Sequence, residues 1–198
     1  ANVRILDSEF KNNTAEDSIN FIESKFEFIR SKISNTSSDA IDADFSTGTV
    51  KESAFKNIGY AGGGDGVDIS GSKINVFNSD FYKIDDKALS IGEKSILNAR
   101  DIQISNSGTG LACKDGSNCE ARNLNITAPV FASILVYMKK PQYGAASLDA
   151  KSVTVSSETK AIYAQTGSVV YVNGQLIQTQ SIDVDKLYDT VMKKQGVK

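Results

Sequence analysis

A phrase of about 22 residues recurs along this chain of 198 residues, and no other feature limits the possible folds as strongly. Residues 37–59 read SSDAIDADFSTGTVKESAFKNIG, and residues 64–85, GDGVDISGSKINVFNSDFYKID, repeat the same order of polar, apolar and turn residues. An apolar residue marks the middle of each phrase, at Ile19, Ile41, Val67, Leu89, Leu111, Ile134 and Ile162. A second apolar column closes each phrase, at Phe10, Ile33, Phe55, Phe81, Ile104, Ile126 and Val155. Two columns that keep nearly the same step predict a stack of similar structural units.

Each repeat alternates apolar and polar residues with a period of two, which is typical of strands with one buried face. Ile41, Ala43 and Phe45, for example, alternate with Asp42 and Asp44. Turn glycines fall between the first and second strands of the repeats, at Gly48, Gly71, Gly92, Gly116 and Gly167. A coil of three short strands cannot bury its own apolar face, so each strand must pair in parallel with the strand one repeat later. We therefore predict an all-β domain at residues 1–180, a right-handed parallel β-helix of about eight coils.

The inward positions and the C-terminal segment complete the predicted architecture. Phe10, Phe45, Phe55 and Phe81 fall on inward columns and are expected in the core. Residues 181–198 change to a helical spacing, with Leu187, Tyr188, Val191 and Met192 on one side and Asp183 or Asp185 as a capping residue. We expect a short C-terminal helix that covers the open sheet edge of the last coil, with a partner-binding tail as the alternative.

A further column contains asparagines. Asn12, Asn35, Asn57 and Asn106 each lie two residues after the closing apolar residue of a repeat, where stacked amides can hydrogen-bond along the rod. With the repeat, this layout resembles the pectate-lyase-like right-handed β-helices, which often carry an asparagine ladder at a tight turn. The resemblance covers residues 3 to 180, and the sequence of residues 38–95 also resembles β-helix repeats in exported, non-enzymatic-looking bacterial proteins of unassigned role. It implies the architecture, but the same coil carries lyases, hydrolases, epimerases and inert surface repeats.

The composition excludes several function classes. The chain has no His and no Trp, so a Ser-His-Asp triad and a typical catalytic zinc site are excluded. The net charge is −2 and no basic tract stands out, so nucleic acid is not an expected partner. No run of about 18 apolar residues is present, and we expect no membrane insertion. The sequence opens in the middle of the repeat pattern, which indicates other domains in a longer polypeptide.

Aspartates are placed so that stacking gathers them into one patch. One predicted outward column contains Asp17, Asp39, Asp65 and Lys87, and the next contains Asn20, Asp42, Asp68 and Ser90, with Asp44 beside it. Turn chemistry explains aspartates at the start of a strand, because the carboxylate accepts nearby backbone N–H groups. Asp42, Asp44 and Asp68 lie mid-strand, where Asp is depleted and needs compensation. Rigid carboxylates are also calcium ligands, so Asp39, Asp42, Asp44, Asp65 and Asp68 are the candidate Ca²⁺ site, the one cofactor expected.

Two functions remain open for this patch. The first is a surface that binds a polysaccharide or cell-surface polymer, with Asp39, Asp65 and the aromatic Tyr60 as ligand-binding residues. Tyr82, Tyr143 and Tyr163 are further aromatics for a sugar surface. The alternative is a polysaccharide lyase, epimerase or hydrolase, with Asp42, Asp68 and Lys87 as catalytic residues and Arg100 as another candidate base. Short loops and the lack of a recognisable enzyme motif favour the binding module.

Two cysteines bear on the compartment. Cys113 and Cys119 bracket the turn sequence KDGSN, so they either close a small disulfide loop or serve as small buried residues. A disulfide and a β-helix of this kind are both typical of exported proteins. The sequence thus predicts an extracellular or cell-envelope module associated with carbohydrate, with an acidic patch suited to Ca²⁺.

Overall fold

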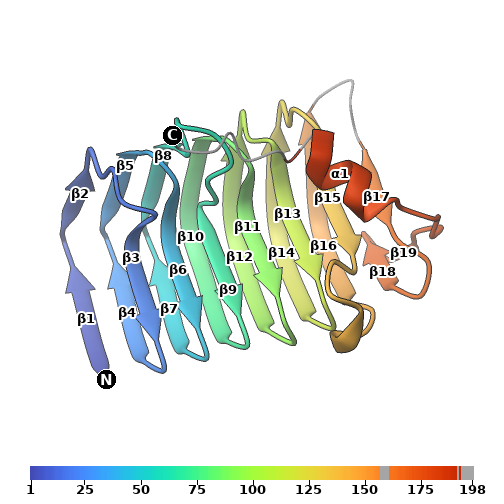
Figure 1. Cartoon of the computed structure of the whole chain (residues 1–198), viewed down its shortest axis with the longest axis horizontal. Coiled ribbons are helices and arrows are strands. Elements are labelled where there is room, and N and C mark those ends of the chain that lie inside the picture. Colours follow the sequence, from blue (N-terminus) through green and yellow to red (C-terminus); the bar gives the residue numbers. More distant parts are fainter. Residues whose placement is uncertain (157–160, 191, 193–198) are drawn as a thin grey trace.

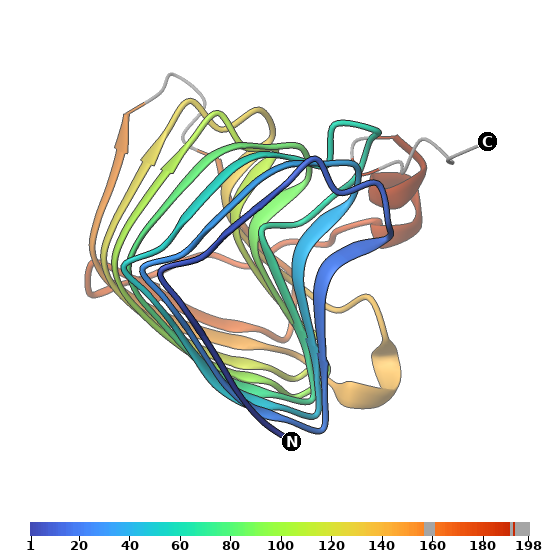
Figure 2. The same ribbon diagram turned by 90° about the vertical axis from the view of Figure 1, so that its left-hand side faces the viewer.

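The chain forms a rod of stacked coils, each coil being one turn of a parallel β-solenoid (Figure 1). The computed structural model describes residues 1–156, 161–190 and 192. Viewed along the rod, successive coils superimpose into a three-sided outline (Figure 2). This confirms the predicted all-β stack with a short C-terminal helix.

Two sheets run along the rod. The seven-stranded sheet has one strand per coil and is parallel throughout: β3 (Asp17–Ile22), β6 (Asp39–Asp44), β9 (Val67–Ser70), β11 (Lys87–Gly92), β13 (Thr109–Lys114), β15 (Ala132–Tyr137) and β17 (Ile162–Ala164). The twelve-stranded sheet forms the other two sides from β1 (Asn2–Leu6), β2 (Glu9–Lys11), β4 (Lys25–Ile29), β5 (Lys32–Thr36), β7 (Thr47–Lys51), β8 (Ala54–Ile58), β10 (Lys73–Ile84), β12 (Ile96–Ser105), β14 (Asn118–Thr127), β16 (Ser147–Ser156), β18 (Val169–Val172) and β19 (Gln175–Leu176). A short 3-10 helix, η1 (Pro141–Tyr143), and one α-helix, α1 (Val184–Thr190), complete the described elements.

Strand register matches the two apolar columns of the sequence. Ile41 lies opposite Val67, and Leu89 lies opposite both Val67 and Leu111. In the twelve-stranded sheet Phe55 lies opposite Phe81. These residues are fully or almost fully buried, so the core is a stack of apolar side chains that runs the length of the rod.

The solenoid has about seven turns, where the sequence predicted about eight. The count is lower because two connections are longer than the repeat requires. Residues 59–66 lie between β8 and β9, and residues 138–146 lie between β15 and β16. These insertions use residues without adding a strand to the stack.

Residues with positive φ turn the chain at the corners. Arg30, Glu52, Asp101 and Asn123 adopt φ values of 48–58° where the twelve-stranded sheet bends between its two sides. Phe45 occupies another such corner, with φ 50°, and 66% of it is exposed. The prediction that Phe45 is a core residue is therefore wrong, because the alternation ends at the corner and the side chain turns outward.

Two ladders of serines line the corners. One contains Ser24, Ser46, Ser72, Ser95 and Ser117, and the other Ser8, Ser31, Ser53 and Ser79. In each ladder the backbone N–H of every serine but the last donates to the Oγ of the serine one coil later, at 2.8–3.3 Å. Most of these hydroxyls in turn donate to the carbonyl oxygen two residues earlier in the chain. The ladders satisfy corner N–H groups that have no strand partner.

Asparagine side chains form a shorter ladder at the third corner. The Nδ2 of Asn35 donates to Oδ1 of Asn12 at 3.4 Å, and the Nδ2 of Asn57 donates to Oδ1 of Asn35 at 3.0 Å. In the following coil Lys83 occupies the corner with φ 58°, so the run stops before Asn106.

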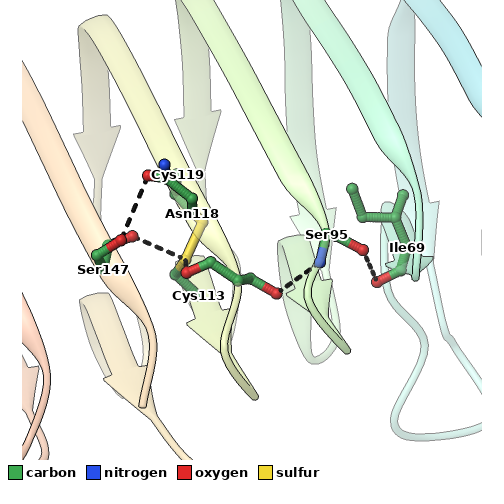
Figure 3. Close-up of a disulfide and its surroundings, with 7 residues drawn as sticks. Ile69, Ser95, Cys113, Asn118, Cys119 and Ser147 are labelled. Atoms are coloured by element: carbon green, nitrogen blue, oxygen red, sulfur yellow. Dashed lines mark hydrogen bonds between the residues drawn. A yellow bond between two sulfur atoms is a disulfide. The ribbon is translucent and has the colours of Figure 1, made fainter. Parts of the chain in front are cut away.

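A disulfide joins Cys113 at the end of β13 to Cys119 in β14, with the two Cα atoms 6.4 Å apart (Figure 3). The bond closes a turn inside a single coil, and both residues are fully buried. Of the two interpretations left open by the sequence, the structure contains the cross-link.

Helix α1 lies against the outer side of the solenoid instead of over its last coil (Figures 1 and 2). Asp183 caps it, with Oδ1 accepting the N–H of Lys186 at 3.0 Å. Leu187 and Met192 pack with outward residues of β13 and β15, including Ala112, Leu135 and Tyr137. The expectation that the helix covers the terminal sheet edge is wrong, because its apolar residues pack on these outward positions of β13 and β15 instead.

Substitution of Ser46 by Ala tests the serine ladders. Ser46 Oγ accepts the N–H of Ser24 at 3.0 Å and is buried. Its removal leaves that donor without its acceptor, so we expect the free energy of unfolding to fall by about 1–3 kcal/mol in urea denaturation. The matched control is Ser34→Ala in β5, whose side chain faces outward. Equal stability of the two variants would contradict the role of the ladders.

The double substitution Cys113→Ala and Cys119→Ala tests the cross-link. A loop of this size is expected to contribute about 2 kcal/mol, which corresponds to a fall in Tm of roughly 4–8 °C for a chain of this length. Reducing agent should lower the Tm of the wild type by a similar amount and leave that of the double variant unchanged. A wild-type Tm indifferent to reductant would contradict the prediction.

Candidate functional site

The outward side of the seven-stranded sheet changes character along the rod. In one column, Asn20, Asp42, Asp68, Ser90, Ala112, Leu135 and Tyr163 lie opposite one another on successive strands. Its N-terminal members are polar, and its later members are apolar and packed beneath α1. We call the open part, which carries Asp17, Asn20, Asp42, Asp44 and Asp68, the acidic face.

A cavity of about 240 Å³ lies where the acidic face meets the helix. Its lining residues are Asp65, Asp68, Asp86, Lys87, Lys114, Lys139, Tyr188 and Met192. Strands β9, β11 and β13 supply Asp68, Lys87 and Lys114, and the connections just before β9 and β11 supply Asp65 and Asp86. The other three are Tyr188 of α1, Met192 just beyond that helix and Lys139 in the loop after β15. We call this space the charged cavity, because it brings three carboxylates and three ammonium groups together.

Lys87 is buried between two carboxylates. Its Nζ lies 3.2 Å from Asp65 Oδ1 and also contacts Asp86 Oδ2. Burial alone would lower the pKa of Lys87, but the attraction of Asp65 and Asp86 outweighs it, and the pKa lies well above its usual value. Burial and the nearby charge of Asp65 raise the pKa of Asp86 to about 6. The group is a buried, charge-balanced network in which Lys87 remains protonated and is not a free base.

Lys114 offsets the negative charge of another carboxylate, that of Asp68. Its Nζ donates to Ser90 Oγ at 2.9 Å and lies 3.7 Å from Asp68 Oδ1. Burial opposes the charge of Lys114, yet Asp68 raises its pKa above the ordinary value. Lys114 thus places a positive charge beside Asp68 at the edge of the charged cavity.

The carboxyl of Asp42 on the acidic face has a strongly raised pKa. Burial first, and then the charges of Asp68, Asp44 and Asp17, raise its pKa from 3.8 to about 7. Asn20 Nδ2 donates to Asp42 Oδ2 at 3.3 Å and to Asp17 Oδ2 at 3.0 Å. Near neutral pH Asp42 is thus partly protonated beside the carboxyl of Asp68 on the neighbouring strand.

The predicted site residues take different roles. Asp39 is buried, and its Oδ1 accepts the N–H of Asp65 at 2.7 Å, a bond between successive coils like those of the serine ladders and not the local turn bond that the sequence suggested. Asp65 likewise accepts the N–H of Lys87 at 2.9 Å. Burial first raises the pKa of Asp44, followed by the charge of Glu93. Asp42, Asp44 and Asp68 share the acidic face, while Asp39 and Asp65 serve the backbone.

Two other predicted residues lie elsewhere. Tyr60 lines a separate hollow of about 160 Å³ with Asn57, Lys83 and Asp85. Arg100 belongs to β12 in the twelve-stranded sheet, where its guanidinium lies 5.1 Å from the centre of the Phe77 ring, so it is not a base for the acidic face.

The calcium prediction gains no support from the geometry. Among residues 1–156, 161–190 and 192, no three His, Cys, Asp or Glu side chains are grouped so as to hold a metal ion. Lysine ammonium groups and a bound proton offset the negative charge of these carboxylates.

Sequence reasoning missed five of the residues that line the charged cavity: Asp86, Lys114, Lys139, Tyr188 and Met192. Lys114 follows Ala112 with outward parity, so extending the outward columns beyond Lys87 would have found it. Asp86 was readable as the neighbour of Lys87 in the run IDDKA. Tyr188, whose hydroxyl lies 2.6 Å from that of Tyr137, carries no such signal because its place depends on where α1 packs.

Comparisons with protein-family models, with curated proteins and with solved structures found no match to this chain. The parallel β-solenoid is therefore established by its own register, and the pectate-lyase-like resemblance rests on the residues quoted for it. Among the described residues, no helix combines the length and the apolar character needed to cross a membrane.

Asp42→Asn tests the charge balance of the acidic face. Between pH 4 and pH 7 the folded protein binds a proton at Asp42 that the unfolded chain releases, so this group lowers stability as the pH rises. We expect Asp42→Asn to raise the free energy of unfolding at pH 8 by about 1–2 kcal/mol, a value reduced for partial exposure of the side chain. The gain should vanish near pH 4.

The control is Asp80→Asn on the outward side of β10, and the measurement is urea denaturation at pH 4, 6 and 8. A gain for Asp42→Asn that is the same at all three pH values would contradict the assigned pKa shift.

Proposed function

We propose that this solenoid is a binding module that holds a polysaccharide chain on the acidic face. The observation that supports the proposal is the in-register column of Asn20, Asp42, Asp68 and Ser90, which leads into the charged cavity. Strand pairing spaces these groups about 4.8 Å apart, a step comparable with one sugar unit of an extended chain. A regular row of polar groups suits a regular polymer.

The chemistry of the column matches hydroxyl groups. A sugar hydroxyl both donates and accepts, and the open part of the column offers the amide of Asn20, the partly protonated acid of Asp42 and the carboxyl of Asp68. The charges of Asp17, Asp42 and Asp44 disfavour phosphate polymers. Neutral or hydroxyl-rich chains are therefore the class of ligand that fits best.

The buried disulfide supports a location outside the cytosol, in the extracellular space or cell envelope. A rigid rod that presents one binding face also suits a module attached to other domains of a longer polypeptide. In this proposal the partner is a polysaccharide of a cell surface or its surroundings.

A second candidate is a polysaccharide-acting enzyme, which one observation favours. The pKa of Asp42 is raised to about 7, and Lys114 Nζ lies 3.7 Å from Asp68 Oδ1 on the adjacent strand. A carboxyl that is partly protonated near neutral pH, beside one paired with an ammonium group, suits an acid and a base in glycoside cleavage. Lys87, held between Asp65 and Asp86, would act only through the charge of that pair.

Binding on a glycan array followed by calorimetry tests the proposal. We expect Asp68→Asn, and to a smaller degree Asp44→Asn, to weaken the selected polysaccharide about tenfold, because one charge-assisted hydrogen bond is lost. The control is Asp80→Asn on the other sheet, which should bind as the wild type does.

The same samples separate the alternatives. Release of reducing or unsaturated sugar that is lost in Asp68→Asn would establish the enzyme. Binding that requires added calcium would support the metal prediction. Absence of any glycan binding, or equal affinity of Asp68→Asn and Asp80→Asn, would overturn the proposed function.

A further inference from the structure

The acidic face is open toward the N-terminal coils and closed toward the C-terminal ones. Along the column that begins at Asn20, Ser90 is fully buried, and Ala112 and Leu135 lie beneath α1. The charged cavity lies at this boundary, with its floor on β9, β11 and β13. A ligand aligned with the column cannot continue past the helix.

The wall at this boundary is well anchored. Leu187 is buried against the β13 and β15 residues, and the hydroxyl of Tyr188 lies 2.6 Å from that of Tyr137. Lys139 Nζ lies 4.3 Å from the centre of the Tyr188 ring, which joins the loop after β15 to the helix. The wall therefore belongs to the fold and presents an aromatic ring and an ammonium group to the cavity.

From this geometry we infer that the site binds the end of a polysaccharide chain and not its middle. The inference rests on the proposed function and adds which part of the polymer is recognised. The terminal sugar occupies the charged cavity, where Asp68, Lys114 and Lys139 surround its hydroxyls. The following sugars extend over Asp42 and Asn20 toward the N-terminal coils.

The cavity volume agrees with this assignment. About 240 Å³ accommodates a single sugar unit and not a chain that enters and leaves. The mixed charges also suit a chain terminus, which presents hydroxyl groups that are absent from internal units because those take part in glycosidic bonds. The cavity volume and the mixed charges both favour the end of a polysaccharide chain over an internal segment.

The inference is tested by measuring how the affinity of the protein depends on the length of the polysaccharide. The polysaccharide selected on the array is cleaved into fractions of about 10 and 100 units, and the Kd of each is measured by calorimetry. End binding predicts the same Kd per chain for both fractions. Binding to internal units predicts a Kd per chain about tenfold lower for the longer fraction, because each chain then offers about ten times more sites.

Opening the wall provides a second test. Leu187→Gln removes the apolar anchor of α1, and Lys186→Gln, on the exposed side of the same helix, is the control. We expect the length dependence to appear in Leu187→Gln and to stay absent in Lys186→Gln. Circular dichroism verifies that the solenoid remains folded in both.

The outcomes are distinguishable from failure of the proposed function. No glycan binding overturns the function itself. Binding whose Kd per chain falls with length in the wild type overturns end recognition and leaves the binding module in place. A length-independent Kd in both wild type and Leu187→Gln would show that the wall does not set the selectivity, which also overturns the inference.

Discussion

Parallel pairing in register between coils about 22 residues apart is the constraint on which this molecule depends. Each backbone group of a strand bonds to the strand one coil away, so every residue lies above a fixed partner. An inward column must stay apolar for the length of the rod, and a corner column must supply a turn in every coil. Serine and asparagine ladders meet the second need by bonding along the same axis as the strands.

Outward columns need be neither apolar nor turn-forming, so they can carry charged residues. Like charges one coil apart, about 4.8 Å, repel by about 0.9 kcal/mol in water and about 3.5 kcal/mol at an effective dielectric of 20. This repulsion is offset in a different way in each coil. Lys87 neutralises Asp65, Lys114 neutralises Asp68, and Asp42 takes up a proton. The acidic face is thus less negative near neutral pH than its aspartates suggest.

The sequence predicted what the stacking dictates and failed where the local pattern changes. The columns through Ile41 and Phe55, and the vertical alignment of Asp42 with Asp68, follow from a repeat that register preserves. Phe45 continues the alternation of apolar and polar residues in the sequence, but the corner turns its side chain outward. The place of α1 could not be derived, because its apolar stripe fits either an open end or an outer face. The serines of the two ladders recur at a step of about 22 residues, so the repeat in the sequence could also have predicted them.

The position of α1 has a physical consequence for any ligand of the acidic face. A solenoid alone offers translational symmetry, so a polymer could slide from one coil to the next with little change in contacts. The apolar outward positions at Ala112 and Leu135 break this symmetry by recruiting the helix, and the helix fixes where sliding stops. Because the floor and the wall are ordered before the ligand arrives, little conformational entropy is lost on binding. In the proposed binding mode the covering helix therefore sets the register of the polymer chain, while the coils set the spacing of its contacts.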